Sequence, residues 1–225
     1  MMAGTRPSAA VDLAIAVSVT LICGFSIPAI TPALNRLGGM REVFALALFQ
    51  FTAEGLVVLL LIAIRRERLS NYGFRSRGVL KSVAIAVLFT MIYDAALSSQ
   101  MGQPVWVPLR RHLALRLSLA AKFPLNLVGI AATVTAWGFF EALYGVFFAN
   151  RLNRIVGHEG HGWLSLGALG FGLFNGLIHA ALGQGVSGLL GSFASGYAIA
   201  VIPAVAGNSW GSVLFQTLTN AVGRM

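Results

Sequence analysis

The stretch AWGFFEALYGVFFA, residues 136–149, decides the fold class of this chain, because every position in it except Glu141 is uncharged. Long unbroken apolar runs are typical of membrane-spanning helices, whereas the strands of a membrane barrel alternate apolar and polar residues. A carboxylate at membrane depth costs roughly 2.5–3.5 kcal/mol on insertion scales. We therefore expect Glu141 to face protein, water or a partner rather than lipid.

The composition of the whole chain also predicts a helical membrane protein. Of its 225 residues, 57% are hydrophobic and 10% are charged, and the mean hydropathy is +0.80. Too few polar side chains remain to cover the surface of a soluble domain of this size. We expect one all-α transmembrane domain over residues 1–225, embedded in a lipid bilayer, with the bacterial inner (cytoplasmic) membrane as its location.

The net charge of +9 lies mostly between the apolar runs. Basic loops hold membrane topology and contact anionic headgroups, so we expect no nucleic-acid partner. The basic loop 65–81 is predicted to lie on the cytoplasmic side of the membrane, with the N-terminus on that same side.

The chain has a single cysteine, Cys23, which excludes an intramolecular disulfide and a cysteine zinc cluster.

Apolar runs of about 20 residues are long enough to span a bilayer. They predict about seven spans, within a range of six to eight, at 10–33, 43–64, 79–98, 124–149, 163–182, 186–205 and 208–222. We interpret the first as a retained helix bent near Pro28 and Pro32 rather than as a signal peptide. The segment 104–121 mixes arginines with leucines, which predicts an amphipathic helix in the headgroup plane or a cap over a cavity.

Polar residues inside the apolar runs are the candidate functional groups: Glu54, Asp94, Glu141, Asn175, His179, Gln216 and Asn220. Asn175 and His179 are four positions apart, and so are Gln216 and Asn220, so each pair shares a helix face. A glutamate beside a histidine can hold and deprotonate a water molecule, and amides can donate hydrogen bonds to an oxyanion. This chemistry describes peptide hydrolysis without a metal or cofactor.

Three other polar features have simpler interpretations. Glu54 either pairs with an arginine or lines a polar cavity, and Asp94 lies near a helix end where it reaches the interface. The loop with His158, Glu159 and His161 is rich in glycine, unlike the helical histidine pair of zinc peptidases, so we expect a solvated loop and no metal site.

The order of these motifs resembles that of the CPBP family of intramembrane endopeptidases (CAAX protease and bacteriocin-processing, also called Abi). The stretches that carry the resemblance are FEALYG (140–145), LFNGLIHA (173–180) and GNSWGSVLFQTLTN (207–220), and it covers roughly residues 120–222. It implies that Glu141 and His179 activate water, that Asn220 and the residue at 216 stabilise the oxyanion with polar support from Asn175, and that the substrate is a membrane peptide or protein.

The chain departs from the family pattern at several motif positions. Phe140 replaces one glutamate of a pair, Gly145 replaces an arginine, and Gln216 replaces a histidine. Glutamine still donates a hydrogen bond but does not titrate.

These substitutions motivate an alternative hypothesis, a catalytically degenerate member that acts as an accessory or assembly subunit beside partner membrane subunits. A third hypothesis, a small transporter, uses the same acids as ion sites.

Overall fold

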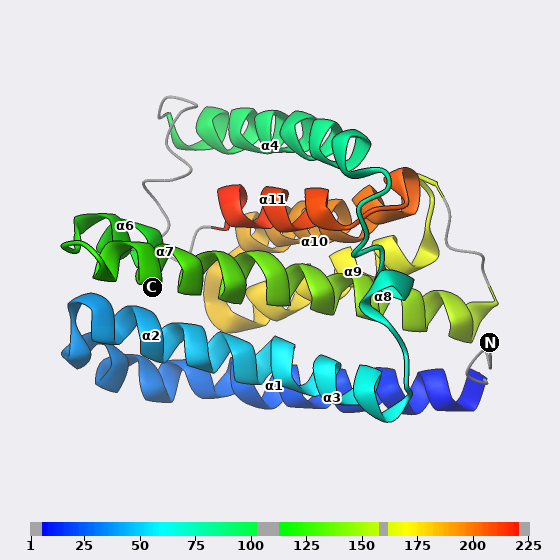
Figure 1. Ribbon diagram of the computed structural model, residues 1–225, viewed down its shortest axis with the longest axis horizontal. Coiled ribbons are helices and arrows are strands. Elements are labelled where there is room, and N and C mark those ends of the chain that lie inside the picture. Colours follow the sequence, from blue (N-terminus) through cyan, green and yellow to red (C-terminus); the bar gives the residue numbers. More distant parts are fainter. Residues whose placement is uncertain (1–5, 103–112, 158–161, 221–225) are drawn as a thin grey trace.

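The computed structural model describes residues 6–102, 113–157 and 162–220, and within these ranges the chain is all-helical (Figure 1). Three features predicted from the sequence fall wholly or partly outside the described residues. They are the first part of the arginine–leucine segment, the loop with His158, Glu159 and His161, and the last residues of the expected span 208–222.

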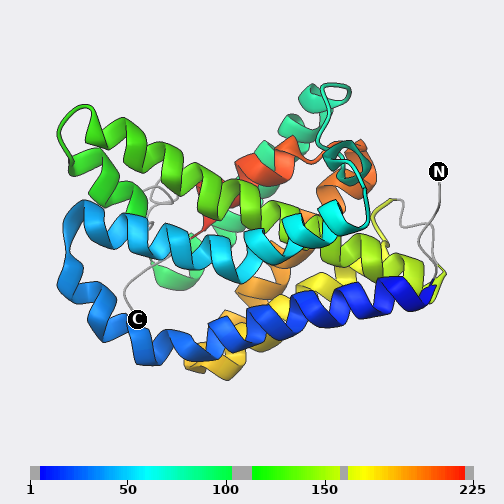
Figure 2. The same cartoon turned by 60° about the horizontal axis from the view of Figure 1, so that its bottom comes forward.

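The first two long helices lie side by side along the molecule. Helix α1 (Arg6–Leu37) ends at a turn in which Gly38 and Gly39 both adopt positive φ angles, 61° and 54°. The returning helix comprises α2 (Gly39–Gln50), the π-helical segment η1 (Phe51–Leu56) and α3 (Val57–Ile64). Figure 2 shows α1 and this helix as two rods joined at one end.

The next helices build the opposite side and the centre of the bundle. A short 3₁₀ turn, η2 (Leu69–Tyr72), leads to α4 (Val79–Met101), and α6 (Leu113–Ala120) packs against α7 (Leu125–Thr133). The chain then runs from α7 through the π-helical segment η3 (Val134–Phe140) into α8 (Glu141–Val156). Every residue from 142 to 149 is buried, so the apolar stretch that decides the fold class forms the central helix.

The last third of the chain is a tightly packed helical pair followed by a short helix. It contains α9 (Leu166–His179), the π-helical segment η4 (Ala180–Gln184), α10 (Gly185–Ala206) and α11 (Trp210–Thr219). The positive φ of Gly183, 88°, breaks the helix and lets α10 fold back along α9. A Cβ atom on Gly176 would lie 2.7 Å from the Leu189 carbonyl oxygen, so small residues permit this close approach.

Five helices among the described residues are long and apolar enough to cross a membrane, which makes this an integral membrane protein. The expected spans 10–33, 43–64 and 79–98 lie within three of them, and the expected span 124–149 begins one residue before the fourth, Leu125–Val156. The fifth, 166–206, corresponds to the expected spans 163–182 and 186–205, which form the antiparallel pair α9 and α10, and it begins three residues after the first of them. The ten residues of α11 extend only about 15 Å, short of a bilayer.

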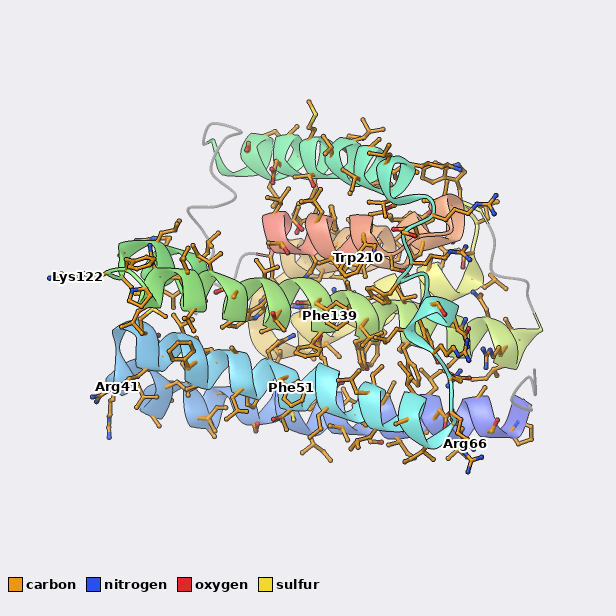
Figure 3. All side chains as sticks on the ribbon, in the orientation of Figure 1. Arg41, Phe51, Arg66, Lys122, Phe139 and Trp210 are labelled. Carbon is orange, nitrogen blue, oxygen red and sulfur yellow. The ribbon has the colours of Figure 1, made fainter. Side chains whose placement is uncertain are left out.

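Charged residues mark the two ends of the helices. Arg41 and Lys122 lie at one end and Arg66 at the other (Figure 3). The described part of the arginine–leucine segment is α6, which exposes Arg116 and buries Ala114, Leu115 and Ser118 against its neighbours.

A buried ion-pair cluster joins α1, the loop after α3, and α8. Arg151 is 1% exposed; its Nη2 lies 2.7 Å from Glu67 Oε2 and its Nε lies 3.1 Å from Asp12 Oδ2. Arg65 also bonds Asp12, at 2.8 Å, and Arg154 bonds Glu67, at 3.1 Å. Because a buried charge is tolerated only when it is paired, this cluster fixes α1 against the rest of the bundle.

Replacing the central arginine of this cluster is expected to destabilise the fold. In Arg151→Ala the carboxylates of Asp12 and Glu67 lose their shared buried partner, and breaking such a pair costs roughly 3–5 kcal/mol. The free energy of unfolding in mixed detergent micelles measures this loss. The exposed Arg68 provides the control, since Arg68→Ala is expected to change stability by less than about 0.5 kcal/mol.

The cluster also predicts a pH dependence of stability. Burial raises the pKa of Glu67, but hydrogen bonds from Arg151, Tyr72 and Arg154 outweigh burial and leave the pKa below its ordinary value of 4.5. A carboxyl with a lowered pKa stabilises the fold above its unfolded pKa and loses that contribution as the pH falls. We expect the unfolding free energy to decline below about pH 4.5, and Glu67→Gln to flatten this decline. An unchanged slope in the variant would contradict the assignment.

Candidate functional site

A cavity of about 470 Å³ lies between α1, α2, η1, α8 and α9. Its lining includes four of the five residues singled out from the sequence as a candidate site: Glu141, His179, Asn175 and Asn220. Glu54 lines the same cavity. Residues from distant parts of the chain therefore meet around one space in the interior of the bundle.

Each of the three titratable groups Glu54, Glu141 and His179 lies within or next to a π-helical segment. Glu54 is within η1, Glu141 directly follows η3, and His179 directly precedes η4. The π-helix is rare, and single turns of it often occur at functional sites because the extra residue changes where side chains point. All three of these segments thus flank the cavity.

The segments η1 and η3 pack against each other through aromatic rings. The ring centroids of Phe51 and Phe140 are 4.8 Å apart, and a Cβ atom on Gly55 would lie 2.7 Å from the Phe140 ring. Phe140 occupies the sequence position where the family that this chain resembles has its paired glutamate. Here a second carboxyl reaches the cavity from Glu54 on the neighbouring segment instead, close enough to Glu141 for the two groups to interact electrostatically.

Two amides lie beside the carboxyl group of Glu141. Asn220 Nδ2 donates a hydrogen bond to Glu141 Oε2 at 2.7 Å, and the Gln216 side chain lies close to the same carboxyl. Gln216 is buried outside the cavity lining, and its Oε1 accepts a hydrogen bond from Ser195 Oγ at 3.4 Å. Asn220 is the residue just past the end of α11, with φ −62° and ψ 112°. Gln216 therefore approaches Glu141 from within the helix and Asn220 from the C-cap, rather than both from one helix face.

The histidine side of the cavity rests on α9 and η4. The Nδ1 atom of His179 is buried and has no hydrogen-bond partner among the described residues. Asn175 Nδ2 donates to the Ser192 carbonyl at 3.0 Å, which ties α9 to α10. Asn175 therefore supports the wall that carries His179 while it lines the cavity.

Unsatisfied polar atoms concentrate around this cavity. Seven buried side-chain nitrogen or oxygen atoms in the described residues lack a hydrogen-bond partner. Five of them belong to cavity-lining residues: both carboxylate oxygens of Glu42, and one atom each of Glu54, Tyr144 and His179. Because buried polar groups are normally hydrogen-bonded, the concentration indicates a space that accepts water or a polar guest.

The structure resolves two open interpretations from the sequence. Glu54 lines the polar cavity, and no arginine or lysine among the described residues lines it. Asp94 is buried on α4 rather than exposed at an interface.

The sequence analysis did not single out Glu42, although it lines the cavity. A charged residue at the edge of the apolar run 43–64 has the pattern of an ordinary residue at the membrane–water interface.

The space beside Gly145 is already filled. A Cβ atom at this position would lie 2.5 Å from Cε1 of Phe171 and 2.7 Å from Cγ2 of Ile199. The arginine that the resembled family carries at this motif position therefore has no room here. Phe171 also lines the cavity, so the glycine lets an aromatic ring form part of the wall.

The described residues contain no group of three or more His, Cys, Asp or Glu side chains placed to hold a metal ion. The histidines at 158 and 161 lie outside the described ranges. No protein-family model, curated protein or solved structure matches the chain. The resemblance to the CPBP family thus depends on the motifs alone.

The close contacts at Gly145 predict that even a methyl group is not tolerated there. Gly145→Ala forces Phe171 or Ile199 to move, and overpacking of this kind costs about 1–3 kcal/mol. Gly24 on α1 has no atom within 4 Å of an added Cβ, so Gly24→Ala is expected to leave stability unchanged or to raise it slightly. Parallel unfolding curves in detergent compare the two variants, and equal stability would contradict the packing at Gly145.

Proposed function

We propose that this protein is a glutamate-type intramembrane endopeptidase similar to the CPBP family. The observation that carries the proposal is the cavity itself, which Glu141 and His179 line together with other residues whose buried polar atoms lack partners. Membrane residues that titrate are expensive to bury, which favours a functional role for three acids and a histidine in one cavity.

In the proposed mechanism a water molecule binds between Glu141 and His179. Glu141 accepts a proton as the water oxygen attacks the carbonyl carbon of the peptide bond, and the same proton then passes to the leaving amine. The products are a carboxylic acid and an amine, so the reaction needs no redox partner. Asn220 keeps the Glu141 carboxyl oriented through a direct hydrogen bond, and the Gln216 amide lies close to the same carboxyl.

The developing oxyanion needs hydrogen-bond donors inside the cavity. Asn220 uses one amide hydrogen on Glu141 and has a second available, and the buried Tyr144 hydroxyl has no partner among the described residues. Donors of this kind each contribute roughly 10²–10³-fold to acyl-transfer rates. Asn220 thus links the base and the oxyanion site.

The proposal includes a membrane arrangement and a substrate class. The chain resides in the bacterial inner membrane, α9 and α10 each cross it, and the expected span at 208–222 is the last of about seven. The substrate is a membrane peptide or protein whose scissile bond reaches the cavity from the bilayer.

The test compares wild type with Glu141→Gln in membranes. Glutamine keeps the size and hydrogen-bonding capacity of the side chain but removes the base, and general-base catalysis contributes about 10²–10⁴-fold. We expect new protein termini, identified by terminal-peptide mass spectrometry, in membranes with the wild type and a loss of that order with the variant. Unfolding curves of the purified variant confirm that the fold is intact.

Turnover that persists in Glu141→Gln would contradict the proposed mechanism.

The second candidate function is the non-catalytic accessory subunit. The filled space at Gly145 and the buried Gln216, which accepts a hydrogen bond from Ser195, favour it. It predicts no termini dependent on Glu141, together with a stoichiometric partner that co-purifies after gentle extraction.

A further inference from the structure

We propose that Glu42 forms a subsite for a positively charged side chain, lysine or arginine, of the peptide substrate. This inference rests on the proposed peptidase function and names the class of substrate that the cavity selects. Glu42 lies in the first turn of α2, at the turn end of the cavity, and takes no part in the hydrolytic chemistry.

The first argument comes from the burial of Glu42. Its side chain is 1% exposed, and neither carboxylate oxygen has a hydrogen-bond partner among the described residues. The neighbouring Arg41 is exposed and does not line the cavity. A buried carboxyl without a partner is costly, and a cation brought by a ligand offsets that cost.

The second argument comes from the surroundings of Glu42 in the cavity. Leu46, Leu113 and Trp137 line the cavity with it, and they offer apolar contact to the methylene stem of a long basic side chain. No described lysine or arginine lines the cavity to compete for Glu42. The exposed Asn35 near the end of α1 is also part of the lining, so the cavity reaches the surface close to this turn.

The third argument is the separation between Glu42 and the hydrolytic centre. Glu42 and Glu54 are twelve residues apart on one continuous helix, which places them about 18 Å apart along its axis. Glu54 interacts with Glu141. An extended peptide advances about 3.3–3.6 Å per residue, so the basic side chain lies about five residues from the scissile bond.

Binding in the Glu141→Gln background tests the subsite without requiring turnover. The probes are two dye-labelled single-span peptides in phosphatidylcholine nanodiscs, identical except that one carries a lysine where the other has the neutral norleucine. We expect the lysine peptide to bind about tenfold tighter or more, by fluorescence anisotropy. Glu42→Gln is expected to remove this preference, and Glu42→Asp to retain most of it.

Arg41→Gln is the matched control, because it changes the charge of the adjacent exposed residue and is expected to keep the preference. Equal binding of the two peptides, or a preference that survives Glu42→Gln, would overturn the subsite.

Cleavage by the wild-type protein of peptides with the lysine at different positions tests the predicted distance between the lysine and the scissile bond. Cuts that follow the lysine at about five residues support it, and cuts that ignore the lysine overturn it.

The two proposals fail in different ways. A lysine preference that depends on Glu42, without any cleavage by wild type, sustains the subsite and rejects the peptidase. Cleavage that depends on Glu141 but treats both peptides alike, with or without Glu42, sustains the peptidase and rejects the subsite.

Discussion

Arg151 brings three separate parts of the chain together at the arginine-rich end of the bundle. Its guanidinium group contacts Asp12 on α1 and Glu67 after α3, and the α8 backbone that carries it continues directly to Glu141. Helix α1 leaves much of its surface half-buried or exposed, so few apolar contacts fix its position. Because α1 forms one wall of the cavity, the shape of the site depends on this buried charge at a distance from it.

The site itself depends on irregular helix geometry. Regular α-helices would present Glu54, Glu141 and His179 according to a fixed rotation per residue, whereas each of them lies within or beside a π-helical turn. The aromatic pair Phe51 and Phe140 locks two of these turns together. The polar groups are thereby held around one space while the apolar surfaces of the same helices still pack in the core.

Hydropathy and spacing predicted much of this arrangement. The apolar runs predicted the long helices, and the cost of an intramembrane acid marked Glu141 as a residue facing a protein interior. The spacing of Asn175 and His179 placed both residues in the cavity lining, as expected for one face of α9. Asn220 also reached Glu141, although the helix ends one residue before it.

Other features were beyond sequence reasoning for physical reasons. A π-helical turn leaves no signature in an apolar run, so the direction of Glu54 was open. The pairing of Asp12 with Arg151 joins residues far apart in the chain, and neither residue shows its partner locally. Helix length gives five such helices among the described residues, because the antiparallel pair α9 and α10 is counted as one long helix across Gly183 and α11 is short.

The π-helical turns have a consequence for how such a chain changes over evolution or in the laboratory. The turn at 51–56 contains one residue more than an α-helical path requires, so deleting a single residue within it would restore a regular helix. The flanking helices α2 and α3 would keep their relative orientation, whereas the side chains within the turn, Glu54 among them, would change direction. Composition and hydropathy would hardly change, yet Glu42 and Glu54 would no longer point into the same space.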